Sequence, residues 1–276
     1  MIFLGPGGVP IASKEKSTIS GVKTCKELGL NAMEVEFVRG VNMSPKLAEE
    51  LGEIARENKI RLSIHAPYFI NLCSQEKKII EASKKRLFDS ADRGESMGAD
   101  TIAIHVGYYG KLSKEEAYEN IKKNFLDVID KMKSHGIKNV KLGTETMGKV
   151  SQFGTLDEAI RLFKEIGVVP YLDFSHIYAL NAGKIDYKEI LDKLETLKLK
   201  HINAHFQSIR WRPAKIKGFG NEWHHTELRF NEPPFEPLAK EILKRKLDIT
   251  LISESPILEL DSLKMKGIFE RLGYDF

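Results

Sequence analysis

Eight short apolar or alternating runs recur along the 276-residue chain, and they constrain its fold more than any other feature. Segments with helical periodicity separate them. Strands that alternate with helices in this way predict a (β/α)8 TIM barrel. The runs are IFLG (2–5), AMEVEF (32–37), IRLSIH (60–65), TIAIHV (101–106), VKLGTE (140–145), VPYLDF (169–174), HINAHF (201–206) and ITLISE (249–254).

The helical segments are clearest at five places: Ser44–Asn58, Gln75–Met97, Ser113–His135, Thr155–Ile166 and Tyr187–Leu197. Thr155 precedes Glu158 by three residues, which is typical of a capping box at a helix start. No linker rich in Pro, Gly or Ser divides the chain, so we expect a single domain spanning residues 1–276. The longest irregular segment, residues 207–237, follows the seventh strand, and a loop of this length is more often functional than filler.

Composition sets the cellular context. No apolar run approaches the roughly 20 residues of a membrane span, and the N-terminal MIFLGPGG lacks the features of a signal peptide. The two cysteines are too few for a disulfide framework. We therefore expect an intracellular, cytoplasmic protein. Its net charge of +4 tolerates a polyanionic partner without demanding one.

Polar side chains gather where the predicted strands end. In a TIM barrel the carboxyl ends of the strands line the active site. The side chains found there are His65, His105, Glu145, Asp173, His176, His205 and Glu254. His201 shares the inward face of the seventh strand with His205 because side chains alternate along a strand. It lies at the opposite end of that strand, and we interpret it as a core residue.

The joint pattern predicts a metal centre. A single histidine at a strand end is more often a hydrogen-bonded structural residue, and a single glutamate an ordinary ion-pair partner. Imidazoles and carboxylates that converge from many strands need a counter-charge, and a divalent ion supplies it. Histidine and carboxylate ligands without thiolate suit Zn²⁺, Mn²⁺ or Fe²⁺. The segment GNEWHH adds Glu222, His224 and His225, which makes too many ligands for one ion and enough for two or three.

With these residues in hand, the chain resembles the endonuclease IV family of metal-dependent apurinic/apyrimidinic endonucleases, built on the xylose isomerase-like barrel. The resemblance covers essentially the whole chain, and the order and spacing of its motifs are more specific than any one of them. The motifs are GPGGVP (5–10), HAPYFINL (65–72), ETMGK (145–149), LDFSHIYA (172–179), HFQS (205–208), EWHH (222–225) and SESP (253–256).

The resemblance implies three ions, with Zn²⁺ as the expected metal. His65, His105 and Glu145 would hold the first ion, and Glu145 would bridge to the second, completed by Asp173, His205 and Glu254. The third would be held by His176, Glu222 and His224. This chain departs from the family pattern in having Glu222 where an aspartate is usual. His225 is adjacent, so the choice between the two histidines stays open; His201 is the less favoured alternative to His205.

The activity implied by the resemblance is hydrolysis of the phosphodiester 5′ to an abasic site in duplex DNA, by a monomer. Glu145 would be the catalytic carboxylate that fixes the spacing between ions. Tyr68 and Phe69 would lie on a loop inserted into the duplex, where aromatic side chains replace lost stacking; the alternative is that they only pack against neighbouring loops. DNA contacts are also expected from Arg39 after the second strand and from Arg210, Trp211 and Arg212 in the long loop.

Two alternatives remain from the residues alone. A sugar isomerase or epimerase on the same barrel would bind one divalent ion through Glu145, Asp173, a histidine of the seventh strand and Glu254. Such an enzyme leaves His65, His105 and the GNEWHH segment unexplained. A DNA-binding or regulatory barrel without catalysis is the other alternative, and the complete ligand set argues against it.

Overall fold

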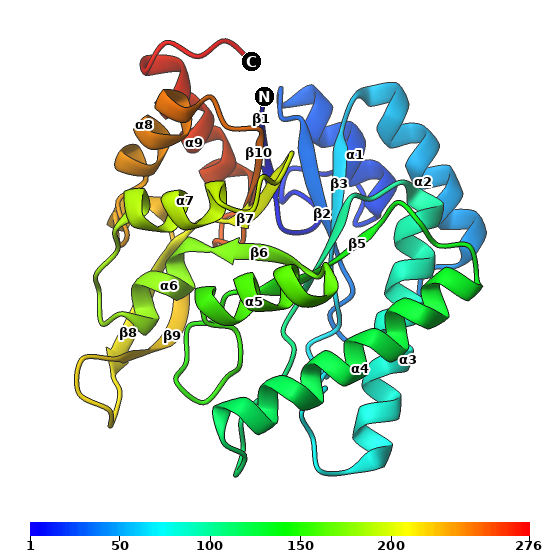
Figure 1. The fold of residues 1–276 in the computed structure, drawn as a ribbon. Coiled ribbons are helices and arrows are strands. Elements are labelled where there is room, and N and C mark those ends of the chain that lie inside the picture. The colour runs from blue at the N-terminus through cyan, green and yellow to red at the C-terminus, as the bar shows by residue number, and fades with distance from the viewer.

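All eight predicted strands are present in the computed structural model, which describes residues 1–276 (Figure 1). They form one parallel sheet in the order β1-β10-β7-β6-β5-β4-β3-β2. The sheet curls until its two edge strands meet, and a parallel bridge between Gly7 and Glu34 joins them. The predicted barrel is thereby confirmed. The strands are β1 (Ile2–Pro6), β2 (Ala32–Glu36), β3 (Arg61–His65), β4 (Thr101–Ile104), β5 (Lys141–Glu145), β6 (Val169–Asp173), β7 (Ile202–His205) and β10 (Ile249–Ser253).

Closure of the sheet depends on one glycine. A Cβ atom on Gly5 of β1 would lie 1.9 Å from the carbonyl oxygen of Ala32, which begins β2. No side chain fits in that space, so only glycine lets the two edge strands approach each other. The backbone bond from Gly8 N–H to Glu34 O, 3.0 Å long, follows from this approach.

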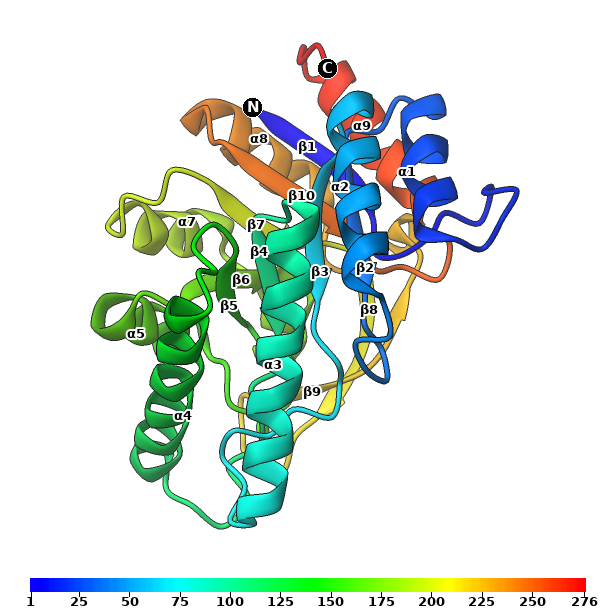
Figure 2. The same cartoon turned by 90° about the vertical axis from the view of Figure 1, so that its right-hand side faces the viewer.

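The helices cover the outside of the barrel (Figures 1 and 2). Thr155 caps α5, and the predicted capping box with Glu158 is present. Both chain termini lie at the end of the barrel where the strands begin. No helix is long and apolar enough to cross a membrane. The helices are α1 (Thr18–Glu27), α2 (Pro45–Asn58), α3 (Lys77–Met97), α4 (Lys114–Ser134), α5 (Leu156–Ile166), α6 (Phe174–Leu180), α7 (Tyr187–Glu195), η1 (Leu228–Phe230), α8 (Phe235–Arg245) and α9 (Glu259–Arg271).

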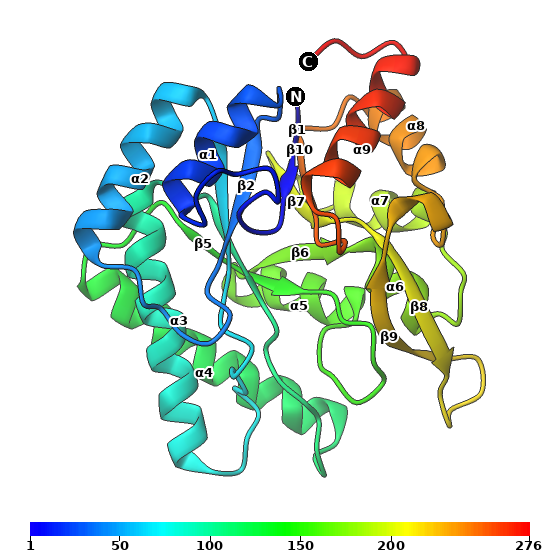
Figure 3. The same cartoon turned by 180° about the vertical axis from the view of Figure 1, so that it is seen from behind.

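The expectation of an irregular segment after the seventh strand was wrong. Residues 208–226 form an antiparallel hairpin of β8 (Ser208–Pro213) and β9 (Gly220–Thr226), which projects beyond the carboxyl ends of the barrel strands (Figure 3). The hairpin packs against α6, so its residues gain a partner that local sequence does not reveal. Its register shifts between Arg210 and Trp211, which marks a β-bulge.

Candidate metal centre

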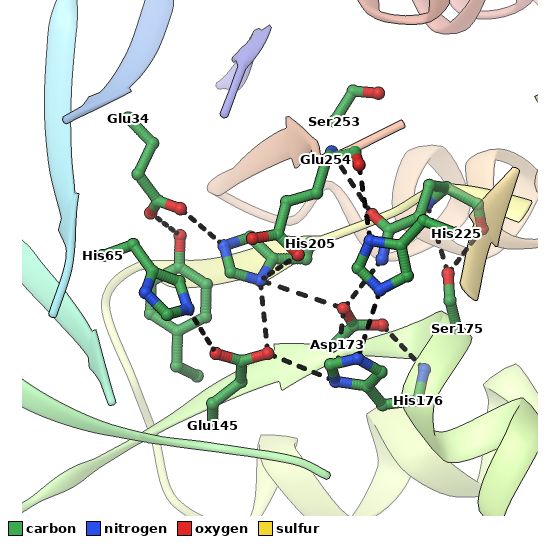
Figure 4. Close-up of polar contacts among 12 residues, drawn as sticks. Glu34, His65, Glu145, Asp173, Ser175, His176, His205, His225, Ser253 and Glu254 are labelled. Carbon is green, nitrogen blue, oxygen red and sulfur yellow. Dashed lines mark hydrogen bonds and ion pairs between the residues drawn. The ribbon is translucent and has the colours of Figure 1, made fainter. Parts of the chain in front are cut away.

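The carboxyl ends of the strands bring the predicted polar side chains to one place inside the barrel (Figure 4). His65 ends β3, Glu145 ends β5, Asp173 ends β6 and His205 ends β7, and each is at most 1% exposed. Since parallel strands of a barrel end at the same edge of the sheet, these four groups converge although they lie far apart in the sequence.

The first group of candidate ligands surrounds one oxygen of Glu145. His65 Nε2 lies 3.2 Å from Glu145 Oε2, and His105 Nε2 lies 3.1 Å from the same atom. His65 Nδ1 donates a hydrogen bond of 2.8 Å to the carbonyl of Ala66. When the ring is neutral, as it is in a metal complex, that bond keeps the proton on Nδ1 and leaves the lone pair on Nε2, the nitrogen that faces Glu145.

The second group faces His205. Its Nδ1 lies 3.5 Å from Glu145 Oε1, 3.8 Å from Asp173 Oδ2 and 3.3 Å from Glu254 Oε2. Gln207 Nε2 donates to Asp173 Oδ2 at 2.9 Å and orients that carboxylate. Glu145 therefore stands between the first and second groups, with one oxygen directed at each.

The third group joins α6 to the hairpin. His176 Nε2 lies 2.8 Å from Glu222 Oε2 and 3.3 Å from His225 Nε2. Both histidines use their other nitrogen as a donor to a backbone carbonyl, His176 to Thr146 at 3.0 Å and His225 to Glu254 at 3.3 Å. Two Nε2 atoms that face each other with free lone pairs suit a shared cation.

The structure places His225, and not His224, at this group. Residues two apart normally share a face of a strand, which would pair Glu222 with His224. The bulge changes the alternation, because Arg210 pairs with His224 while Trp211 pairs with Glu222, leaving Trp223 unmatched. Glu222 and His225 therefore point inward together, and the exposed ring of His224 packs against Trp223 with a centroid distance of 4.5 Å.

Two acidic residues of β2 belong to the site and were missed in the sequence. Glu34 is fully buried; its Oε1 accepts a 2.7 Å bond from His205 Nε2, and its Oε2 accepts from Ser63 and Tyr171, also at 2.7 Å. Glu36 lies within 4.8 Å of Glu34 and Glu254. Glu34 and Glu36 are two residues apart, so both face the inside of the barrel. A charged residue at an inward-facing strand position was the sequence feature that could have identified them as part of the site.

The arrangement fits divalent ions in two respects. Glu145 Oε1, His205 Nδ1 and Glu222 Oε2 are buried without a hydrogen-bond partner, which is costly unless another group binds them. The ligand-to-ligand distances also match, since tetrahedral zinc with bonds of about 2.05 Å separates its ligands by about 3.3 Å. The chemistry of the donors is that of Zn²⁺, Mn²⁺ or Fe²⁺ sites.

The pKa shifts point the same way. Burial disfavours the imidazolium of His65, yet its bond to Glu145 and the charge of Glu36 raise the pKa of His65 to about 10. Burial also opposes ionisation of Glu145, but His105 and His205 outweigh it and hold the pKa of Glu145 well below its usual range. Burial is the main reason that the pKa of Glu36 rises to about 8. Carboxylates that hold protons on these histidines attract a divalent cation to the same nitrogen atoms.

The expected DNA-contacting residues differ in their surroundings. Tyr68 stands at the mouth of the site, with its ring centroid 5.1 Å from that of His65, and Phe69 beyond it is 62% exposed. Arg39 is exposed on the loop after β2. All three are free to meet a ligand at this rim.

The hairpin residues are less uniform. Arg212 is exposed and lies 3.8 Å from the ring centroid of Trp223. Arg210 forms a 2.7 Å ion pair with Glu232. Trp211 is half-buried and packs against Gly183, where an added Cβ would lie 2.8 Å from the indole ring. Arg212 is therefore the most available of the three for a ligand.

His201 lies at the other end of β7, away from the candidate centre. Its Nδ1 donates a hydrogen bond of 2.6 Å to Asp248, and its Nε2 accepts one of 2.8 Å from the hydroxyl of Thr250. Both ring nitrogens have partners, so the geometry agrees with the core interpretation.

Comparison with known proteins places this geometry in a family. The family model described as "Xylose isomerase-like TIM barrel" matches residues 22–265. The chain belongs to the xylose isomerase-like TIM barrel family. It is 36% identical to an uncharacterized protein of Methanocaldococcus jannaschii, over 99% of this chain and 98% of that protein. It is 27% identical to a "Probable endonuclease 4" of Aster yellows witches'-broom phytoplasma, over 97% of each chain.

Solved structures with the same fold include both enzyme types considered above. Endonuclease IV from Thermus thermophilus superposes with a TM-score of 0.71 at 20% identity, over 97% of this chain and 98% of that one. A D-tagatose 3-epimerase-like protein superposes with a TM-score of 0.66 at 18% identity, over 96% of each chain. The predicted kinship with endonuclease IV is thus confirmed by named relatives, while the fold is common to nucleases and epimerases.

Proposed function

We propose that this protein is a metal-dependent endonuclease that hydrolyses the phosphodiester 5′ to an abasic site in duplex DNA, acting as a monomer in the cytoplasm. The observation that carries the proposal is the presence of three adjoining ligand groups. A single ion takes four to six ligands, and the groups around Glu145, His205 and His176 together offer more. The relatives named as endonuclease 4 support the same activity.

Bound divalent ions would supply Lewis-acid stabilisation of the phosphate and of the departing oxygen, and a nucleophile at neutral pH. The protein's own residues prepare the site for this chemistry. Glu145 directs one oxygen to each of two groups and so sets their spacing. Gln207 and Glu34 hold Asp173 and His205 in place.

The rim would receive the DNA. Tyr68 lies against His65 and His105, with ring centroids 5.1 and 5.5 Å away, so its ring borders the centre at the rim. Phe69 extends outward from the same loop, where it can fill the gap in the base stack at an abasic nucleotide. Arg39 and Arg212 offer positive charge to the phosphate backbone.

The test is cleavage of a labelled duplex that carries one abasic-site analogue, with metal content measured on the same sample. We expect a cut 5′ to the analogue, at least two ions per chain, and a loss of about 10³-fold in rate for Glu145→Gln. Glu95→Gln is the matched control, because Glu95 accepts hydrogen bonds from Asn139, which precedes the start of β5, and it belongs to none of the ligand groups. Absence of cutting by a sample that holds two or three ions would refute the proposal.

A sugar epimerase is the second candidate. The set Glu145, Asp173, His205 and Glu254 forms one compact ligand group by itself, and a structure with an epimerase-like name shares the fold. One ion per chain, no cutting of the duplex and turnover of a ketose would select this alternative. Retention of activity by His176→Ala would favour it further, because a single-ion epimerase does not need the third group.

A further inference from the structure

We propose that Lys149 lowers the affinity of the third ligand group for its ion, so that this ion exchanges with solution while the other two stay bound. Lys149 lies on the loop after β5, and its Nζ is 2.9 Å from Glu222 Oε1. The other oxygen of that carboxylate, Oε2, lies 2.8 Å from His176 Nε2 in the third group. One carboxylate is therefore divided between a cation of the protein and a candidate metal site. The inference rests on the metal centre of the proposed function and not on its substrate.

Lys149 distinguishes the carboxylate of the third group from the other ligand carboxylates. The ion-pair partners of Glu145, Asp173 and Glu254 are all histidines. A histidine that binds a metal is neutral, so these three carboxylates keep their full negative charge for the ions. Glu222 instead shares its charge with an ammonium group. A positive charge this close to a carboxylate weakens the attraction of that carboxylate for a further cation.

The charges of the ligands order the second and third groups in the same way. Asp173 borders both groups, so its charge does not distinguish them. The second group adds Glu145 and Glu254, and neither has a lysine or arginine partner. The third group adds only Glu222, whose charge Lys149 compensates. Because affinity for a divalent ion depends on the charge of its ligands, we expect the third ion to be the most weakly bound.

The position of Glu222 is fixed independently of Lys149. Its backbone N–H donates a hydrogen bond of 2.7 Å to Gly148 O, and Val150 N–H donates one of 3.1 Å to Asn221 Oδ1. Gly148 also leaves room for the carboxylate, since a Cβ atom there would lie 2.5 Å from Glu222 Oε2. These contacts hold the hairpin residue at the third group without the lysine. Loss of Lys149 should therefore strengthen the binding of the ion, because it removes a repulsive charge and leaves the ligand in place.

The test is a competitive chelator titration of the full-length protein loaded with Zn²⁺, in which the ions released are counted at each chelator concentration. We expect one of three ions to leave first. Lys149→Met removes the charge, and we expect it to hold that ion about tenfold more tightly. This is the lower end of the effect of a charge within about 4–6 Å, because the lysine side chain is 40% exposed. Lys149→Arg keeps the charge and should keep the original affinity.

Two further variants support the assignment of the ion. Lys188→Met is the matched control, because Lys188 on α7 forms an ion pair of the same length, 2.9 Å, with Asp192, and neither residue belongs to a ligand group. Its ion release should equal that of the unsubstituted protein. His225→Ala removes a ligand of the third group, so we expect it to lose the ion that leaves first and to keep the other two.

Four results would overturn the inference: no tightening by Lys149→Met, equal tightening by Lys149→Arg, equal tightening by Lys188→Met, or a chain that never holds more than two ions. The last result would leave the proposed function standing, since that function requires two ions. A chain that releases its ions as expected and does not cut the abasic duplex would refute the proposed function and support this inference. The two proposals can therefore fail separately.

Discussion

His201 and His205 lie at opposite ends of the same strand, and their surroundings differ completely. His201 has a partner for each ring nitrogen, Asp248 and Thr250. His205 bonds Glu34 through Nε2 and turns its Nδ1, buried and without a hydrogen bond, towards three carboxylates. Where the strands begin, both ring nitrogens of His201 are satisfied by hydrogen bonds within the protein. Where the strands end, Nδ1 of His205 would be satisfied only by a further bound group. Satisfied and unsatisfied polar atoms thus separate a structural histidine from a ligand.

Removal of His205 is expected to give the largest effect. His205→Ala takes away the one nitrogen of the second group, so we expect the loss of one ion per chain and at least ~100-fold slower cleavage. This loss is larger than the loss usually seen when a residue that only hydrogen-bonds a metal ligand is changed. Metal analysis and the abasic-duplex assay measure the two quantities. Full metal content in this variant would break the comparison, since His205 would then be no more a ligand than His201.

Glu34→Gln tests the carboxylate behind His205 and ranks second. Ser63 and Tyr171 both donate to Glu34 Oε2, so the glutamine will turn its oxygen towards them and its amino group towards His205 Nε2. His205 must then accept at Nε2 and carry its proton on Nδ1, where a metal would bind. We expect about 10–100-fold weaker metal affinity. A competitive chelator titration measures this, and an affinity equal to that of the unsubstituted protein would remove Glu34 from the site.

The two ends of the barrel also show what sequence can reveal. Strand and helix positions followed from local periodicity, and every predicted strand lies within two residues of its observed bounds. Ligands at strand ends, such as His65 and Glu145, were predictable because barrel topology brings strand ends together. His225 was not selected over His224, since the bulge that turns it inward comes from pairing with β8. Glu34 was missed because its role depends on His205, 171 residues away.

The aromatic residues at the rim come third in expected effect. Tyr68→Ala with Phe69→Ala removes the side chains above the candidate centre, and we expect about tenfold weaker binding of abasic duplex, because stacking on a base contributes about 1–3 kcal/mol. Metal content should stay unchanged, which separates these residues from ligands. Leu126→Ala on α4 is the control, as Leu126 is 40% exposed and lies on the outer helical layer. Equal affinities for all three proteins would show that the aromatic residues only pack on neighbouring loops.

His201→Ala is expected to have the smallest effect on catalysis and to act on stability alone. The substitution leaves the buried hydroxyl of Thr250 without its partner, so we expect the free energy of unfolding to fall by about 1–2 kcal/mol. Cleavage and metal content per folded molecule should remain at the original level. His135→Ala, at the exposed end of α4, is the matched control, with a change within ~0.5 kcal/mol.

The difference in the free energy of unfolding between the original protein and His201→Ala should depend on pH, which sharpens the test. Burial, followed by the charge of Arg61, lowers the pKa of His201, so the folded protein favours the neutral ring. Its contribution is therefore fully present above the ordinary histidine pKa of about 6.5 and declines as the pH falls below it, where the unfolded chain takes up a proton first. Denaturant unfolding at several pH values should show that the unfolding free energies of the original protein and of His201→Ala approach each other in acid. A gap that widened in acid would mean that His201 is held as a cation, and the contrast with His205 would need another cause.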